Sequence, residues 1–369
     1  MMTDQLTFII AGILAVLALV TPLCSAFFRR PPIEDDEVFN PTTPLSVIIP
    51  AHNMARELER HIPLIMSQHY QPGFEVIVVN DMSDDDTDEV LQRFKADYPN
   101  LHTTYVPDSN HYVSRRKLAI TLGVKAAKNE WIILTEADCY PATDHWLQSM
   151  AGHMTDDADA LCAYTNYEED TKGVYVFHRL LMSCYLLNRP YRYEGANMAF
   201  RKSAFMSRNG FLHNLMYLRG EYDFLVNDSH QVNVTTAPES RVIQSEPAHA
   251  DWLDHRLHSM ETRRHLAGSF IPRLLFNLDM SLLHLNYVAD IAAIVCSAVT
   301  ANFILLGVAV FCLLLSLTVR TVIMRKAVNA FDEHIATYKL PLLETAVVWQ
   351  NIWYMLKHKT TDKYDYIRK

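Results

Sequence analysis

The sequence predicts an α/β fold: a mainly parallel sheet flanked by helices, with transmembrane helices before and after it. Two patterns carry this prediction. Short β-branched runs of strand length alternate with amphipathic segments of helical length in the middle of the chain. Long apolar stretches with few charges lie near both ends. With 369 residues, half of them hydrophobic, the chain is large enough to bury a sizeable core.

The first apolar stretch covers residues 6–28 and is long enough to span a bilayer. No basic residue precedes it, and it is too long for the apolar region of a signal peptide, so we expect an uncleaved anchor over residues 1–30. Arg29 and Arg30 follow it. The positive-inside rule therefore predicts an inner-membrane protein whose folded domain lies in the cytoplasm. The proline-rich, acidic segment 31–44 reads as a linker.

A second apolar stretch covers residues 282–319. It is either one long helix or a transmembrane hairpin that turns near Ala301 and Asn302. Three basic residues follow it: Arg320, Arg325 and Lys326. One crossing would place these charges outside, whereas a hairpin returns them to the cytoplasm, so the charge distribution favours the hairpin.

The tail over residues 320–369 is predicted to be cytoplasmic or interfacial. Its segment 341–357 mixes aromatic and apolar residues with few charges. This composition is typical of a helix that lies among lipid headgroups. Packing into the protein core is the alternative.

The central region reads as strands alternating with helices, beginning after the linker. Strands are expected over residues 45–50, 74–80, 101–106 and 131–135, and helices over 55–68, 87–98 and 115–128. In such sheets, ligands bind beyond the carboxyl ends of the strands. Polar residues follow three of the expected strands, in the stretches 51–53, 80–81 and 136–138. A ligand site is therefore predicted at this edge.

The composition limits what that ligand is. A net charge of −9 argues against nucleic acid. The chain has no glycine-rich phosphate loop, so a phosphate-bearing ligand would need a cation and basic side chains. Glu136 and Asp138 are spaced to supply oxygen ligands to Mg²⁺ or Mn²⁺, although such a pair at a strand end is more often a solvated turn. The six cysteines show no zinc-site spacing, and we interpret them as reduced thiols.

Six segments, in order, carry a resemblance to a known family: "SVIIPAHN", "VIVVNDMSDDDT", "RRKLAITLGVKAAKNEWIILTEADCYP", "YEGANMAFRKSAF", "RGEYDFLVN" and "ETRRH". The chain resembles the family 2 glycosyltransferases, which have the GT-A nucleotide-sugar fold. The resemblance covers roughly residues 45–270, and we expect the GT-A domain over residues 45–275. It implies a mainly parallel sheet that binds a nucleotide sugar, as in membrane-anchored bacterial-type members.

The resemblance implies which residues bind the donor. Asp81 matches the aspartate that contacts the nucleotide base, and Ala51 and His52 would line the same pocket. Lys117 matches the lysine near the diphosphate. Without the resemblance, a lone lysine would be read as a surface charge.

The remaining donor-side residues follow in the same way. Asp138 matches the second aspartate of the DxD motif, the ligand of Mg²⁺ or Mn²⁺. Glu136 stands in place of the first aspartate, so it binds either the metal or the ribose. Asn197 lies in the stretch beside the sugar. Arg264 matches the arginine of the family's Q-x-x-R-W motif and could pair with the diphosphate.

An inverting transfer also needs a general base for the acceptor hydroxyl. Glu221 and Asp223 lie in the matching acidic motif, but the spacing "GEYD" departs from the family's adjacent acids, so the register is ambiguous. We expect Glu221 to be the base, with Asp223 as the alternative.

The sequence thus predicts an inverting, metal-dependent glycosyltransferase at the cytoplasmic membrane face. Its partners would be a UDP- or GDP-sugar donor, a lipid-linked or saccharide acceptor, and the membrane itself. A nucleotidyltransferase is the less favoured enzyme, because "PAHNMARELER" lacks the glycine of its N-terminal loop. A catalytically inactive GT-A-like protein that binds carbohydrate or a protein partner is the other alternative.

Overall fold

The computed structural model describes residues 2–28, 41–108, 114–187 and 190–362. The chain forms two compact units. One contains the long apolar helices with α6 (Gly173–Leu186), and the other contains the sheet domain. Helix α6 lies inside the range 45–275 that the sequence suggests for one domain, yet it belongs to the helical unit. Arg29, Arg30 and the predicted linker as far as residue 40 lie outside the described residues.

The sheet domain is built on a seven-stranded sheet in the order β3-β2-β1-β4-β8-β6-β9. Its first four strands along the chain are parallel to one another: β1 (Leu45–Ala51), β2 (Phe74–Asn80), β3 (Leu101–Tyr105) and β4 (Trp131–Thr135). Three more complete it: β6 (Ala160–Ala163), β8 (Asn197–Arg201) and β9 (Val232–Thr235). Strand β8 runs antiparallel to both β4 and β6. The predicted mainly parallel sheet is confirmed.

Helices cover both faces of the parallel strands, which explains why these strands are almost wholly apolar. On one face, Val47 and Ile49 belong to the core cluster shared with α2 (Ala55–Met66) and α3 (Thr87–Asp97). On the other, α4 (Arg115–Ala126) approaches the sheet through Gly123. A Cβ at this glycine would lie 2.7 Å from Ile48 Cγ2, so only glycine allows the close approach.

A second, three-stranded sheet in the order β5-β10-β7 continues from the carboxyl end of β4. Its strands are β5 (Cys139–Pro141), β7 (Thr165–Tyr167) and β10 (Val242–Gln244). The remaining helices of this domain are α5 (Trp146–Gly152), α7 (Lys202–Ser207), α8 (Glu221–Asp228) and α9 (His249–Thr262). None of the six cysteines, all of which are described, forms a disulfide.

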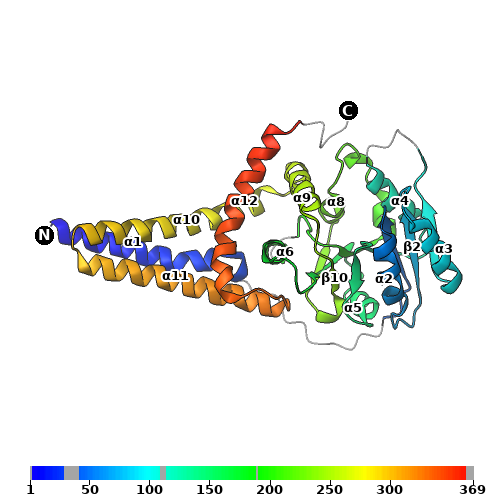
Figure 1. Cartoon of the computed structure of the whole chain (residues 1–369), viewed down its shortest axis with the longest axis horizontal. Coiled ribbons are helices and arrows are strands. Elements are labelled where there is room, and N and C mark those ends of the chain that lie inside the picture. Colours follow the sequence, from blue (N-terminus) through cyan, green and yellow to red (C-terminus); the bar gives the residue numbers. More distant parts are fainter. Residues whose placement is uncertain (1, 29–40, 109–113, 188–189, 363–369) are drawn as a thin grey trace. The chain divides into compact units, whose positions relative to one another are not determined.

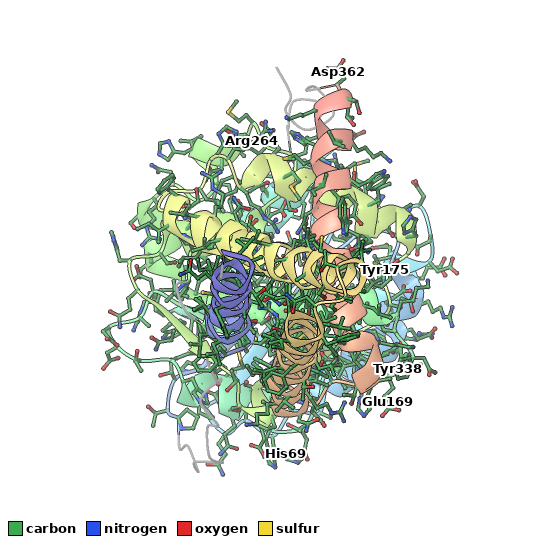
Figure 2. The ribbon with its side chains drawn as sticks, turned by 90° about the vertical axis from the view of Figure 1, so that its left-hand side faces the viewer. His69, Glu169, Tyr175, Arg264, Tyr338 and Asp362 are labelled. Atoms are coloured by element: carbon green, nitrogen blue, oxygen red, sulfur yellow. The ribbon has the colours of Figure 1, made fainter. Side chains whose placement is uncertain are left out.

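The helical unit contains α1 (Met2–Cys24), α10 (Phe270–Val299) and α11 (Phe303–Ala330), which pack side by side (Figure 1). Figure 2 views α1 and α11 nearly along their axes, with α10 crossing obliquely. Among the described residues, three segments are long and apolar enough to cross a bilayer: Gln5–Cys24, Phe270–Val299 and Phe303–Ala330. A turn at Ala301, with φ of 53°, separates the last two. The stretch predicted at 282–319 is therefore a hairpin of two longer helices, and the alternative of one helix is wrong.

A buried ion-pair network explains why both arms extend beyond the apolar stretch. Arg320 lies inside α11, where its Nη2 is 2.6 Å from Glu344 Oε1 and 3.2 Å from Asp279 Oδ1. Its Nη1 donates to the Thr21 carbonyl at 2.7 Å, and all three charged side chains are buried. Thus Arg320, which the sequence placed just beyond the hairpin, is an interior residue, and Arg325 and Lys326 remain in the last turns of α11.

Helix α12 (Leu340–Thr360) contains the segment 341–357. In the helical unit it buries Leu340 and Val347 and exposes Trp349. In the sheet domain, its end contacts α9, because Trp252 Nε1 donates to Tyr354 Oη at 3.2 Å. One side of the helix is packed and the other is exposed, and its location among lipid headgroups stays a prediction.

The Arg320 network predicts a large effect of Arg320→Met. The change leaves two buried carboxylates without their cation, and breaking such a network costs about 3–5 kcal/mol. We expect a matching fall in the free energy of unfolding in detergent. Lys326→Met, which removes an exposed lysine from the same helix, should change it by less than about 0.5 kcal/mol. Equal effects of the two variants would contradict the structural role of the network.

Candidate active site

The carboxyl ends of β1 and β2 are joined at Asp81. Its backbone N–H donates to the Ala51 carbonyl at 2.8 Å, and His52 Nδ1 lies 2.7 Å from the Asp81 carbonyl oxygen. The Asp81 carboxylate accepts a hydrogen bond from Arg115 Nε at 2.7 Å. The structure thus brings together three of the residues predicted to bind the donor and adds Arg115 to them.

Glu136 follows β4 and is held by two partners from other elements. Arg116 of α4 pairs with its Oε1, and Tyr222 Oη of α8 donates to the same oxygen at 2.7 Å. Burial raises the pKa of Glu136, and the negative charge of Asp138 adds to this increase, while Arg116 and Tyr222 oppose it. The carboxylate therefore lies in a confined place where added positive charge would be favourable.

Asp138 begins the turn into β5, two residues after Glu136. Its Oδ2 accepts from Gln244 Nε2 at 2.9 Å, and its carbonyl accepts from the Ser245 N–H at 3.2 Å. Strand β10 thus fixes the position of Asp138. Within the described residues, no three His, Cys, Asp or Glu side chains converge as a ready-made metal site.

Helix α8 presents the third group of acidic residues. Gly220 precedes it in the left-handed conformation, with φ of 95°, and Glu221 is its first residue. Glu221 is buried, and its Oε2 lies 3.6 Å from Arg116 Nε. Arg116 therefore links Glu136 to Glu221, and Oε1 of Glu221 is buried without a hydrogen-bond partner among the described residues.

Asp223, the alternative base, is placed differently. Its Oδ1 accepts from the Tyr193 N–H at 3.1 Å, so the carboxylate helps to hold the loop before β8. Burial raises the pKa of Asp223, while the guanidinium groups of Arg192 and Arg263 oppose the increase. Of the two acids, Asp223 has the clearer structural role.

Lys117 does not point to the strand ends. Its side chain is completely buried, and Nζ donates to the backbone carbonyls of three residues in the loop before α8: Asn214 at 2.8 Å, Tyr217 at 2.6 Å and Arg219 at 3.3 Å. Burial lowers the pKa of Lys117 to about 8, although Glu221 opposes the shift. The diphosphate contact suggested for Lys117 stays a prediction.

Asn197 and Arg264 are not joined to this group by any described contact. Asn197 is completely buried in β8, where its side chain bonds to Trp146 Nε1 at 3.2 Å and to the Ser240 carbonyl at 2.7 Å. Arg264, labelled in Figure 2, is half exposed and lies 3.5 Å from Glu261. Their donor-side roles also stay predictions.

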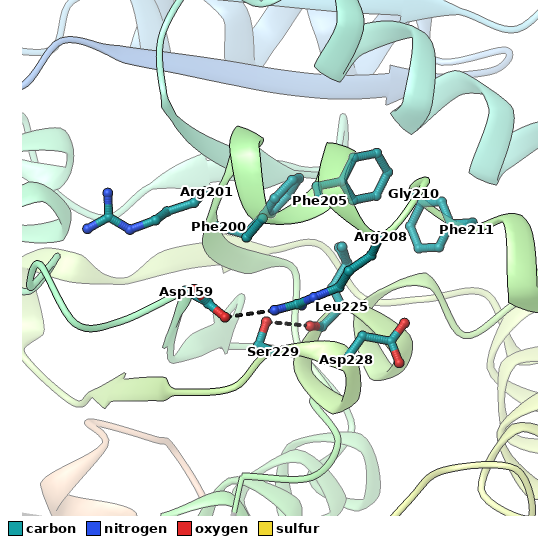
Figure 3. A pocket seen from close by; sticks show the side chains of 11 residues that line it. Asp159, Phe200, Arg201, Phe205, Arg208, Gly210, Phe211, Leu225, Asp228 and Ser229 are labelled. Atoms are coloured by element: carbon teal, nitrogen blue, oxygen red, sulfur yellow. Dashed lines mark hydrogen bonds and ion pairs between the residues drawn. The ribbon is translucent and has the colours of Figure 1, made fainter.

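A small hollow lies elsewhere in the sheet domain (Figure 3). Phe200, Phe205 and Phe211 line it beside the Arg208–Asp159 ion pair. It adjoins Arg201, which pairs with the first residue of β4, whereas Asn197 pairs with the last. The hollow is therefore at the other end of β8 from the carboxylates.

Comparison with known proteins identifies the domain. Residues 46–218 match the family model described as glycosyl transferase family 2. This match covers most of the α/β domain and a little under half of the chain. The family 2 match ends before Glu221, so α8 and α9 lie beyond it.

Curated relatives agree over the same region. The uncharacterized glycosyltransferase YibD of Escherichia coli (strain K12) is 27% identical over 124 residues, which are 33% of this chain and 34% of that protein. Chondroitin synthase of Escherichia coli is 29% identical over 133 residues, which are 36% of this chain and 19% of the synthase. The matches thus span about a third or less of these relatives.

A solved structure shares the fold over a longer range. The mannosyltransferase PcManGT from Pyrobaculum calidifontis, in complex with GDP-Man and Mn²⁺, matches with a TM-score of 0.53. The likeness covers 94% of this chain and 99% of that one at 17% identity. It confirms the predicted GT-A fold.

Three residues that contact the strand-end acids were not expected from the sequence: Arg115, Arg116 and Tyr222. The two arginines directly precede Lys117, and only the lysine was assigned a role from the sequence. The signal that could have found them is the run of three cations at the start of a helix, opposite strand-end acids that need partners.

Proposed function

We propose that this protein is a membrane-anchored, metal-dependent glycosyltransferase that transfers a sugar from a nucleotide-sugar donor to an acceptor with inversion. The observation that carries the proposal is that the first turn of α4 contacts three acidic groups through Arg115 and Arg116. Asp81 and Glu136 lie at strand ends, and Glu221 is linked to Glu136 through Arg116. Such strand ends are where α/β sheets bind ligands.

The donor would lie across the ends of β1, β2 and β4. In this proposal Asp81, with Ala51 and His52, binds the nucleotide base, and Glu136 contacts the ribose or the cation. The bond between Arg115 and Asp81 supports this role, because it fixes the carboxylate in one orientation. The donor is a UDP- or GDP-sugar; PcManGT, which shares the fold, binds GDP-Man.

The carboxylates fit a divalent cation that shares its ligands with the donor. Mg²⁺ usually takes one or two protein carboxylates and completes its shell with substrate phosphates and water, so a full protein cage is not needed. Asp138 is the proposed ligand, and the mutual repulsion between Asp138 and Glu136 favours a cation beside them. When bound, Mg²⁺ or Mn²⁺ would neutralise charge on the leaving diphosphate.

Glu221 is the proposed base. An acceptor hydroxyl attacks the anomeric carbon, its proton passes to the unpartnered Glu221 Oε1, and the bond from that carbon to the diphosphate breaks. Arg116 holds the other oxygen of the carboxylate. Asp223 is the less favoured base, because it already supports the backbone at Tyr193.

The acceptor is proposed to be a lipid-linked or growing saccharide at the cytoplasmic face of the inner membrane. Three helices suited to cross a bilayer support a location at the membrane. The basic residues Arg29, Arg30, Arg325 and Lys326 support the orientation.

Reporter fusions after residue 40 and after residue 330 test the orientation. Both junctions should report a cytoplasmic location, because each follows basic residues at the end of a candidate span. A fusion after residue 301, in the turn of the hairpin, is the control and should report the opposite side. An external report from either of the first two junctions would refute the orientation.

Asp138→Asn tests the metal ligand. The change keeps the size of the side chain but removes the charged oxygen, so the affinity for a nucleotide sugar in Mn²⁺ should fall and transfer should be abolished. Isothermal calorimetry with and without Mn²⁺ measures the first effect. Asp144→Asn, which alters an exposed aspartate of the same domain, is the control. Unchanged metal-dependent binding would remove Asp138 from the site.

Glu221→Gln tests the base. The variant keeps its shape but cannot accept a proton, so transfer should fall by about 10²–10⁴-fold while nucleotide-sugar affinity stays near wild type. Asp223→Asn is the paired variant. If only Asp223→Asn abolishes transfer with normal donor binding, then Asp223 is the base. If both variants transfer sugar normally, the base does not lie in this motif.

A further inference from the structure

Lys117 is a buried cation whose ammonium group donates its hydrogen bonds to the loop before α8. Nζ reaches the carbonyls of Asn214, Tyr217 and Arg219, which are three acceptors for the three protons of a charged lysine. It also lies 4.9 Å from the ring centre of Phe224 in α8 itself. The side chain thus contacts both the loop and the helix that the loop leads into.

This loop sets the position of Glu221. It ends at Gly220, whose left-handed conformation starts α8, and Glu221 is the next residue. Ser114, the residue that caps α4, adds a second tie, because its Oγ donates to the Leu218 carbonyl at 2.9 Å. The first turn of α4 therefore holds the loop over residues 214–219 at four carbonyls.

Binding a donor diphosphate would require Nζ to leave these carbonyls. Three acceptors would then lose their partner, and leaving buried polar groups unsatisfied is costly. Arg115 and Arg116, the neighbouring cations of the same turn, already face the strand-end acids. The strand-end side of the site thus has two cations of its own besides Lys117.

We propose that Lys117 is a positioning residue of the acceptor side and not a ligand of the donor diphosphate. Its contacts hold the loop that places Glu221. This inference rests on the proposed function for its catalytic consequence. Lys117 acts through the loop over residues 214–219 and through its contact with Phe224 in α8. A displacement of about 1 Å in a reacting group costs about 10²-fold in rate, so the expected effect is on turnover and not on donor affinity.

Lys117→Met tests this role, with Lys125→Met as the matched control from the exposed end of the same helix. For Lys117→Met we expect donor affinity within about twofold of wild type by calorimetry, and a fall in kcat of about 10²-fold. Lys117→Arg, which keeps the charge and several donors, should recover part of the lost kcat. A fall in donor affinity with unchanged kcat at saturating donor would overturn the inference.

Hydrogen–deuterium exchange gives a readout that does not depend on transfer. Amides of residues 214–220 should exchange faster in Lys117→Met, and those of β1 and β2 should not change. If Lys117→Met does not fold, Ser114→Ala removes one of the four ties and should show the same two effects in weaker form. Unchanged exchange in the loop would overturn the inference, whether or not the wild-type protein binds a nucleotide sugar. If the wild-type protein binds no nucleotide sugar, the proposed function is refuted instead.

Discussion

The first turn of α4 ties the parallel sheet to helix α8. Consecutive helical residues point in directions about 100° apart, so one turn reaches several elements at once. Its contacts are Ser114 to Leu218, Arg115 to Asp81, Arg116 to Glu136 and Glu221, and Lys117 to the carbonyls before α8. The close packing of Gly123 on Ile48 fixes this helix against β1. The acidic groups therefore keep their relative positions because they share one rigid support.

Charge compensation explains why so many acids are tolerated in a small region. Buried carboxylates are stable only when hydrogen bonds or opposite charges offset their lost hydration. Arg115 forms an ion pair with Asp81, and Arg116 forms ion pairs with Glu136 and Glu221. Arg192 and Arg263 offset the charge of Asp223. Asp138 accepts a hydrogen bond from Gln244, and its negative charge raises the pKa of Glu136.

Local patterns in the sequence were sufficient to predict the parallel strands. They were not sufficient to predict where single side chains point. The runs at 45–50 and 74–80 are β-branched and buried on both faces, so they allow no other assignment, and the strands lie where expected. The partners of Lys117 are about 100 residues away in the chain, and no local spacing indicates them. Arg320 was placed just beyond the hairpin for the same reason: its partners Asp279 and Glu344 are interior only once three helices have packed together. Helix α10 begins earlier than its apolar stretch because this ion pair allows Asp279 to be buried.

Gly220 limits which inherited changes the protein tolerates. A Cβ at this position would lie 2.5 Å from Thr262 Cγ2, in a backbone conformation that other residues adopt only with strain. An alanine there would alter no ionisable group and no residue usually searched for in an active site. It would nevertheless push the start of α8 away from α9 and move the adjacent Glu221. Among natural variants of this chain, an unremarkable small-to-small exchange at Gly220 is therefore expected to be as damaging as the loss of a charged residue, and drift at this codon should be rare.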